Sequence, residues 1–444
     1  MEEPQQNKKN EFVLIEKIKE RPVNKKKLFR RTVITAAMAV IFGLIACFTF
    51  LLLEPVISNW LYPEEDPLIV VFPEDQEEMS PEEMLADNME QQNQQQIASS
   101  QNPSLGQDKI QQILSEVDLD INNYRQLYNA MYSYTEDLNK YMVTVTGITS
   151  NIDWFNNVEE SENKSSGVII ANNGRELLIL TDYAPLEKAK TLSLTFYNGV
   201  RADASVKQQD ATTNLAVLAV DLDYLEESFL KEHVKIASLG SSNLKNVVGI
   251  PVVAIGRPMG TSNSLGYGMI TSTPIQISEA DTNYKLLQTD IHGSQNAGGV
   301  LFNLQGQVIG IITNNHKGSD MKNIITAYGI TELKKRIEKM SNNAEMAYLG
   351  ISGVDVTSEA NEELGVPFGA YIKEVEMDSP AMQAGIQQGD ILVMLNEQDI
   401  VSFGEYIDLL MQLEVGETVE VVVMRQAYNE YKEMTFHIVL GEKE

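Results

Sequence analysis

The chain has 444 residues, with 34 Lys and Arg against 63 Asp and Glu, a length typical of two or three folded units. Its formal net charge of −29 argues against a sequence-independent nucleic-acid binder, which needs clustered basic residues. The single Cys47 excludes an intramolecular disulfide framework and a Cys-based zinc site, and we expect no metal and no cofactor.

The first 31 residues are basic, whereas the rest of the chain is acidic. Residues 1–31 hold ten Lys or Arg and five acids, a net charge of +5 that leaves −34 on the remainder. Residues 32–53 are uncharged. As a helix this run would be ~33 Å long, enough to cross a hydrocarbon core of ~30 Å.

The order of these two segments predicts a cell-membrane protein with a single pass. Because the basic residues come first, we expect a cytoplasmic tail over 1–31, a transmembrane helix over 32–53 and an extracytoplasmic remainder. A cleaved signal peptide is the alternative, but its apolar core would normally be shorter, and Leu53-Glu54-Pro55 is a poor cleavage site.

Residues 54–107 are predicted to be a disordered linker, rich in acids and then in Gln. Such a composition buries too little apolar area to offset the entropy of ordering. Residues 108–140 then show an apolar heptad seam, which predicts a helix. The seam consists of Ile110, Leu114, Val117, Ile121, Tyr124, Tyr128, Met131, Thr135, Leu138 and Met142. The helix either pairs with its own copies as a coiled coil or packs on the following domain.

Short β-branched runs separated by turn residues fill residues 141–340 and predict a mainly β domain, a barrel or a sandwich. The clearest runs are Met142–Thr146, Val168–Ala171, Leu177–Leu180, Leu192–Phe196, Ala216–Val220, Val252–Ile255, Lys285–Gln288 and Val308–Ile312.

An ordered series of motifs in this region resembles serine proteases of the HtrA/DegP type. It includes Ser166-Gly167-Val168, Leu180-Thr181, Asn214-Leu215-Ala216-Val217-Leu218, Gln288-Thr289-Asp290 and Asn296-Ala297-Gly298-Gly299. The resemblance implies a chymotrypsin-like double β-barrel and homotrimeric assembly, which would agree with the heptad seam.

The resemblance also implies a Ser–His–Asp triad, which acyl transfer by this mechanism requires. The three matching positions hold Ala184 for the histidine, Asn214 for the aspartate and Ala297 for the serine. Alanine can neither attack a carbonyl nor accept a proton. The sequence therefore predicts a protease fold without catalytic residues.

The loop before Ala297 departs from the family pattern as well. It is one residue shorter than usual, and Gln295, followed by Asn296, stands where glycine normally frees the backbone to form an oxyanion hole. A relocated site built on Ser294 and His292 is the alternative, but no third group is evident beside this pair.

Residues 345–444 resemble a PDZ domain of the HtrA type, on Ser379-Pro380-Ala381, Ala384-Gly385-Ile386 and Gly389-Asp390-Ile391-Leu392. The resemblance implies that an extended peptide adds a strand beside the sheet edge following Ile351. We expect the peptide to be bound by Tyr348, Leu349, Gly350, Ile351, Ile407, Leu410 and Met411. The alternative for the last three is packing in the domain core.

Together these features predict a membrane-anchored HtrA-like pseudoprotease acting in envelope protein quality control as scaffold, sensor or regulator. Its expected partners are C-terminal or unfolded protein segments, an active HtrA-type relative and copies of itself. An active serine endopeptidase with a non-standard site is the alternative function.

Overall fold

The computed structural model describes residues 25–61, 67–75, 121–152, 158–243, 247–315, 321–428 and 430–443. These residues fall into two compact units, one up to residue 66 and one from Pro67 onward. The tail predicted over 1–31 lies largely outside the described residues, as does most of the linker.

The described residues of the first unit form one helix, α1 (Lys25–Leu61), which extends eight residues past the predicted end of the membrane span. No helix within the described ranges combines the length and hydropathy that a membrane crossing needs, so the span expected over 32–53 is not supported.

In the second unit the protease-like part is mainly β, as predicted. Strands β1, β2, β3, β6, β5 and β4 pair in that order to close a barrel. Their bounds are Met142–Ile152, Val158–Asn172, Glu176–Asp182, Leu215–Asp221, Arg201–Asp210 and Thr191–Phe196. Small helices flank them: η1 (Asn139–Tyr141), η2 (Ala184–Leu186), η3 (Leu222–Tyr224) and α5 (Glu227–His233).

A second sheet follows with the order β10, β11, β14, β13, β12, β8 and β9, and β7 added beside β13. Their bounds are Ile275–Glu279, Thr282–His292, Ile324–Gly329, Gln307–Thr313, Gly299–Phe302, Pro251–Gly256, Ser264–Met269 and Ser238–Leu239. A bridge between Ile270 and Thr289 brings the β9 end back to β11 and curls this sheet. Each of the eight runs predicted from sequence lies within a strand.

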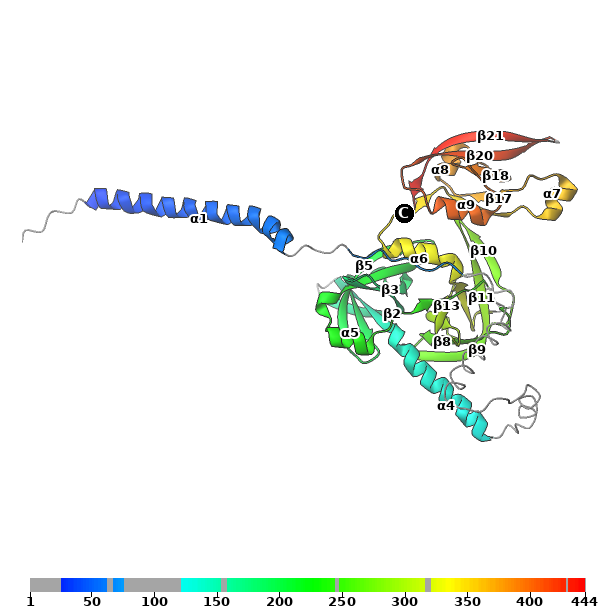
Figure 1. The fold of residues 1–444 in the computed structure, drawn as a ribbon, viewed down its shortest axis with the longest axis horizontal. Coiled ribbons are helices and arrows are strands. Elements are labelled where there is room, and N and C mark those ends of the chain that lie inside the picture. Colours follow the sequence, from blue (N-terminus) through cyan, green and yellow to red (C-terminus); the bar gives the residue numbers. More distant parts are fainter. Residues whose placement is uncertain are drawn as a thin grey trace, which may run out of the picture. The chain divides into compact units, whose positions relative to one another are not determined.

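The C-terminal part is a separate sheet with its own core, joined through η5 (Thr331–Leu333) and α6 (Lys334–Ser341). Strands β16, β17, β18, β20 and β21 pair in that order, β19 joins β18, and β15 pairs with β22. Their bounds are Ile351–Asp355, Ala370–Val375, Ile391–Leu395, Thr418–Ala427, Glu430–Val439, Gln398–Asp399, Ala347–Tyr348 and Gly441–Glu442. The helices are α7 (Ser358–Leu364), α8 (Pro380–Ala384) and α9 (Phe403–Leu410), and β20 and β21 form the long red hairpin of Figure 1.

The described end of the predicted stalk is a helix, α4 (Ile121–Leu138), that packs on the following domain. Its C-terminal end packs on the barrels, where Leu138 is buried and the Tyr134 hydroxyl donates to the Asn303 carbonyl at 2.5 Å. Its first turns leave Ile121, Tyr124 and Tyr128 more than half exposed. The seam positions before residue 121 lie outside the described residues.

The prediction of a disordered linker over 54–107 is wrong for residues 67–75, which we call the strap. The strap lies extended against the protease-like part: the Val70 N–H donates to Asn342 Oδ1 at 2.9 Å, and Asn342 Nδ2 donates back to the Val70 carbonyl at 2.7 Å. At its end the Asp75 carboxylate accepts from Thr331 and Ser241 and pairs with Lys334. These hydrogen-bond and ion-pair partners lie far away in the sequence. They hold the strap in place although its own segment is acidic.

We expect the strap to come loose only in strong acid. Burial raises the pKa of Asp75, but hydrogen bonds from Lys334, Thr331 and Ser241 outweigh it and hold that pKa below the ordinary value of 3.8. A depressed carboxyl pKa stabilises the docked form above pH 3.8, and this stability is lost as the pH falls through the lowered pKa. Proteolysis of the strap at graded pH measures this, and release near pH 5 would contradict it.

Asp75→Ala should weaken docking of the strap by about 1–3 kcal/mol at neutral pH, and Glu74→Gln, at an exposed neighbour, should not.

Candidate functional site

The three positions that match the protease triad lie on one pocket of the barrel domain. Ala184 follows the end of β3, Asn214 precedes β6 and Ala297 precedes β12, and all three line a cavity of about 610 Å³. Asn214 has φ +57°, a left-handed conformation that Asn adopts more readily than most residues. The fold thus gathers the triad positions as a protease would, from segments far apart in sequence.

Amides, hydroxyls and four charged side chains line this pocket, the charged ones being Glu162, Lys164, Asp182 and Arg257. Among the described residues that line it, none is His or Cys. Its hydroxyls are engaged: Ser165 Oγ donates to the Asp182 carbonyl at 2.9 Å and Thr213 Oγ1 donates to Asp210 at 2.8 Å. Burial raises the pKa of Asp182, against the opposing effects of the Ala184 N–H and the Arg257 charge. Among the described lining residues, no imidazole therefore stands beside a hydroxyl.

The backbone around Ala297 is folded into a compact turn. The Ala297 N–H donates to the Ser294 carbonyl at 3.2 Å, and the Gly298 N–H donates to the Arg257 carbonyl at 3.2 Å. Asn314 Nδ2 donates to the Ala297 carbonyl at 2.6 Å. An oxyanion hole needs preorganised donors aimed at the developing charge. Here the N–H at the nucleophile position already has a partner inside its own loop.

The pair considered as a relocated site does not line the pocket. His292 ends β11, paired with Ile324 of β14, and is exposed. Ser294 Oγ accepts from the Asn296 N–H at 3.1 Å, and the Ser294 N–H donates to the Pro258 carbonyl at 2.9 Å. Gln295 and Asn296, by contrast, lie on the pocket wall as expected.

The predicted peptide-binding loop between β15 and β16 forms a carboxylate site. The N–H groups of Leu349 and Gly350 converge on one oxygen, Oδ2 of Asp281, at 2.8 and 2.7 Å. The Ile351 N–H donates to Oδ1 at 3.1 Å. Gly350 has φ +87°, and an added Cβ would lie 2.2 Å from Ser379 Cβ, so this turn requires glycine.

Helix α9 supplies a further hydrogen-bond donor to Asp281, the side chain of Tyr406, which the sequence analysis did not predict. The Tyr406 hydroxyl donates to Asp281 Oδ1 at 2.5 Å, from a fully buried side chain. Of the three predicted groove residues, Leu410 belongs to the core instead and Ile407 is half-buried against that core. Met411 is 7% exposed. A tyrosine on an apolar helix face was the available signal, because a buried hydroxyl needs a partner.

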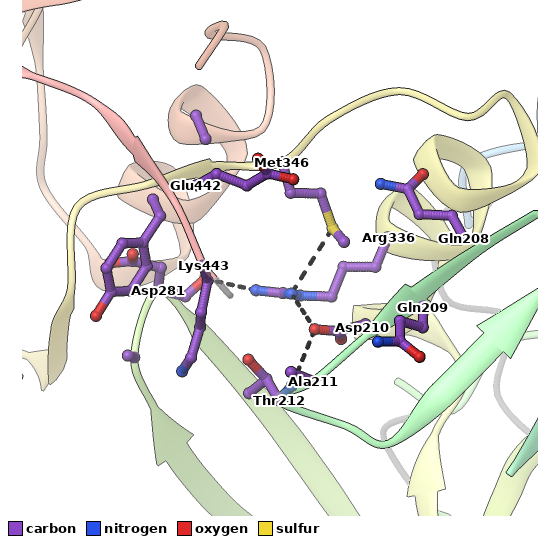
Figure 2. A pocket seen from close by; sticks show the side chains of 13 residues that line it. Gln208, Gln209, Asp210, Ala211, Thr212, Asp281, Arg336, Met346, Glu442 and Lys443 are labelled. Atoms are coloured by element: carbon purple, nitrogen blue, oxygen red, sulfur yellow. Dashed lines mark hydrogen bonds and ion pairs between the residues drawn. The ribbon is translucent and has the colours of Figure 1, made fainter. Parts of the chain in front are cut away.

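Arg336 of α6 connects this site to the first barrel, as Figure 2 shows. Its guanidinium lies 3.3 Å from Asp210 of β5 and donates to the Asp281 carbonyl at 3.1 Å. The third partner is the sulfur of Met346 at 3.8 Å. Arg336 and Asp210 are 6% and 5% exposed and line a small pocket of about 50 Å³. The arginine therefore holds Asp281 through its backbone.

Electrostatics at the site follow from burial. Burial raises the pKa of Asp281, and the hydrogen bonds from Tyr406, Gly350, Ile351 and Leu349 oppose that rise. Burial and the neighbouring Asp281 carboxyl also raise the pKa of Tyr406 well above its ordinary value.

Over the described ranges, no group of three or more His, Cys, Asp or Glu side chains could hold a metal ion.

Comparison with known families matches two segments of the chain. Residues 165–311 match the trypsin-like peptidase domain, and residues 347–438 match the PDZ domain. The serine protease Do-like HtrA of Bacillus subtilis is 30% identical over 337 residues, which cover 70% of this chain and 72% of that protein. Its HtrB counterpart from the same organism is 30% identical over 282 residues, and there the match covers 59% of each.

A solved structure shows the same fold. A variant of the HtrA-type protease AlgW, solved with a decapeptide, superposes with a TM-score of 0.50 at 21% identity. The match covers 70% of this chain and 98% of that one.

Proposed function

This chain belongs to the HtrA family of serine proteases with a trypsin-like peptidase domain and a PDZ domain, and we propose that it binds peptides without cleaving them. It would act in envelope protein quality control as scaffold, sensor or regulator of an active relative. Its ligands would be C-terminal or unfolded segments of other proteins. One observation carries the proposal: the PDZ loop presents three N–H groups to a carboxylate, while the hydrolytic positions hold Ala184, Asn214 and Ala297.

The loss of hydrolysis is supported by chemistry at each position. Without an imidazole at 184 no base takes the proton of a nucleophile, and without an oxygen at 297 no nucleophile attacks. A site without its triad retains a rate enhancement of at most about 10³–10⁴-fold over the uncatalysed reaction, which is far too little for useful proteolysis.

A cleavage assay tests this part of the proposal. Purified full-length protein should leave unfolded casein intact over hours, beside an active HtrA-type protease as the positive control. Authentic cleavage would instead support the second candidate, an endopeptidase with a non-standard site. If Ser294→Ala then abolished cleavage, that residue would be its nucleophile.

A binding assay tests the other part. A peptide selected from a randomised C-terminal library should bind as the free acid and lose binding as the amide, because the loop recognises a carboxylate. Gly350→Ala should abolish binding, since the new Cβ would collide with Ser379. Equal binding of acid and amide would contradict PDZ-type recognition.

Assembly with copies of the same chain is proposed from α4, whose first turns carry exposed apolar side chains. Sedimentation of the protein with and without residues 108–140 tests it. A monomer in both cases would refute the coiled-coil alternative.

Attachment to the cell membrane, with the basic tail in the cytoplasm, is proposed from the sequence alone. It rests on the uncharged run over 32–53 after ten basic residues. The test is extraction of cell membranes at alkaline pH: the full chain should stay in the pellet, and a variant lacking residues 32–53 should not.

A further inference from the structure

We propose that Asp281 is a built-in ligand of the PDZ carboxylate site, so that the groove is closed by the chain's own β10–β11 hairpin. A C-terminal peptide would then bind only after this hairpin has left. The inference rests on the proposed peptide binding and adds its regulation.

The carboxylate of Asp281 makes the contacts that a peptide terminus would make. Both of its oxygens are used: Oδ2 accepts from Leu349 and Gly350, and Oδ1 accepts from Ile351 and Tyr406. The residue is only 2% exposed. Each N–H group has a single proton to donate. The same three N–H groups therefore cannot hold Asp281 and a peptide terminus at once.

The hairpin also occupies the strand edge beside the loop. The Asp281 N–H donates to the Ile351 carbonyl at 2.8 Å. Two residues along β16, Gly353 donates its N–H to Ser278 Oγ at 3.1 Å and accepts from that hydroxyl at 2.7 Å. Strand β16 pairs with β17 through its other edge. The hairpin thus lies where an added peptide strand would lie.

Burial of the Asp281 side chain opposes this closure. Its carboxyl group is taken out of water, and burial raises its pKa. The polar and charged groups that face it come from three elements: Tyr406 from α9, Tyr348 from β15 and Arg336 from α6. The groove is therefore closed by a ligand that can be displaced.

The hairpin competes with any added peptide as a tethered ligand. A tethered group acts at an effective concentration in the millimolar range. The apparent dissociation constant of a free peptide rises as the fraction of open protein falls. Removing the Asp281 carboxylate should therefore strengthen binding of a free peptide, although it removes hydrogen bonds from the folded protein.

The test measures binding of one C-terminal peptide, as free acid and as amide, to purified full-length protein. We expect Asp281→Ala and Asp281→Asn to bind the free acid about tenfold or more tightly than the unchanged protein. Glu279→Gln, which removes a carboxylate from the same hairpin outside the loop, should bind as the unchanged protein does. Equal affinity for all four proteins would overturn the inference and leave the proposed peptide binding intact.

Hydrogen exchange supplies a readout that needs no peptide, and its first arm uses the unchanged protein alone. The N–H groups of Leu349, Gly350 and Ile351 should be protected in the unchanged protein without ligand, and lose that protection in Asp281→Ala. Unprotected N–H groups in the unchanged protein would overturn the inference. Protection combined with no peptide binding by any variant would support the closed groove and reject the proposed function.

Discussion

The triple variant Ala184→His, Asn214→Asp, Ala297→Ser is expected to remain at least about 10²-fold less active on casein than the same variant with a rebuilt loop. The rebuilt form adds Gln295→Gly and one glycine inserted between Gly293 and Ser294. Loss of a single oxyanion-hole donor costs about 10²–10³ in rate. In this chain the N–H at position 297 donates to the Ser294 carbonyl and cannot serve as that donor.

Both proteins carry the same three substitutions at the triad positions, so the comparison isolates the loop. Ala184 is exposed on the pocket rim, with room for an imidazole. Asn214 sits at φ +57°, which Asp also tolerates. Labelling by a fluorophosphonate reports whether the introduced hydroxyl is activated, separately from turnover of casein.

Two results would count against this account of the site. Full activity in the triple variant without the loop changes would mean that the oxyanion donors are already in place. Activity in Ala297→Ser alone would mean that a base other than the residue at 184 serves the nucleophile.

The strands and the triad positions were predictable because their signals are local. Runs such as Leu177–Leu180 carry their β-branched character within a few residues, and turn residues bound them. The motif before Leu215 places Asn214 whatever the rest of the chain does. The structure then brings Ala184, Asn214 and Ala297 to one pocket.

The contacts that close the PDZ groove could not be predicted from local sequence signals. Asp281 lies about seventy residues before the loop that it fills, and nothing near it in sequence indicates that partner. The strap illustrates a missed signal instead. Leu68 to Phe72 are five consecutive apolar residues within an acidic region, and Val70 among them is buried in the barrel core. Averaging composition over the whole linker concealed that run.

Arg336→Met is expected to lower the free energy of unfolding by about 3–5 kcal/mol, because it leaves Asp210 buried without its charge partner. The same substitution removes the donor to the Asp281 carbonyl, so the hairpin should leave the PDZ groove more easily. Urea unfolding and binding of a free-acid peptide measure the two effects on the same protein.

Lys335→Met is the matched control. Lys335 precedes Arg336 on α6 and pairs with Asp408 at 2.8 Å, but both of these side chains are about half exposed. A surface pair of this kind contributes about 0–1 kcal/mol. The contrast between neighbouring substitutions separates loss of a buried pair from loss of any charge on the helix.

A double variant decides whether the buried charges act as a pair. Asp210→Leu with Arg336→Met should be less destabilised than the two single losses added together, with a coupling of about 0.5–3 kcal/mol. The double variant will not regain the full stability of the unchanged protein, because Asp210 also accepts hydrogen bonds from Thr213 Oγ1 and the Thr212 N–H, which Asp210→Leu removes. Strict additivity would mean that each residue acts through its other partners. If additivity held while peptide affinity still rose, Arg336 would hold the hairpin through the Asp281 carbonyl alone.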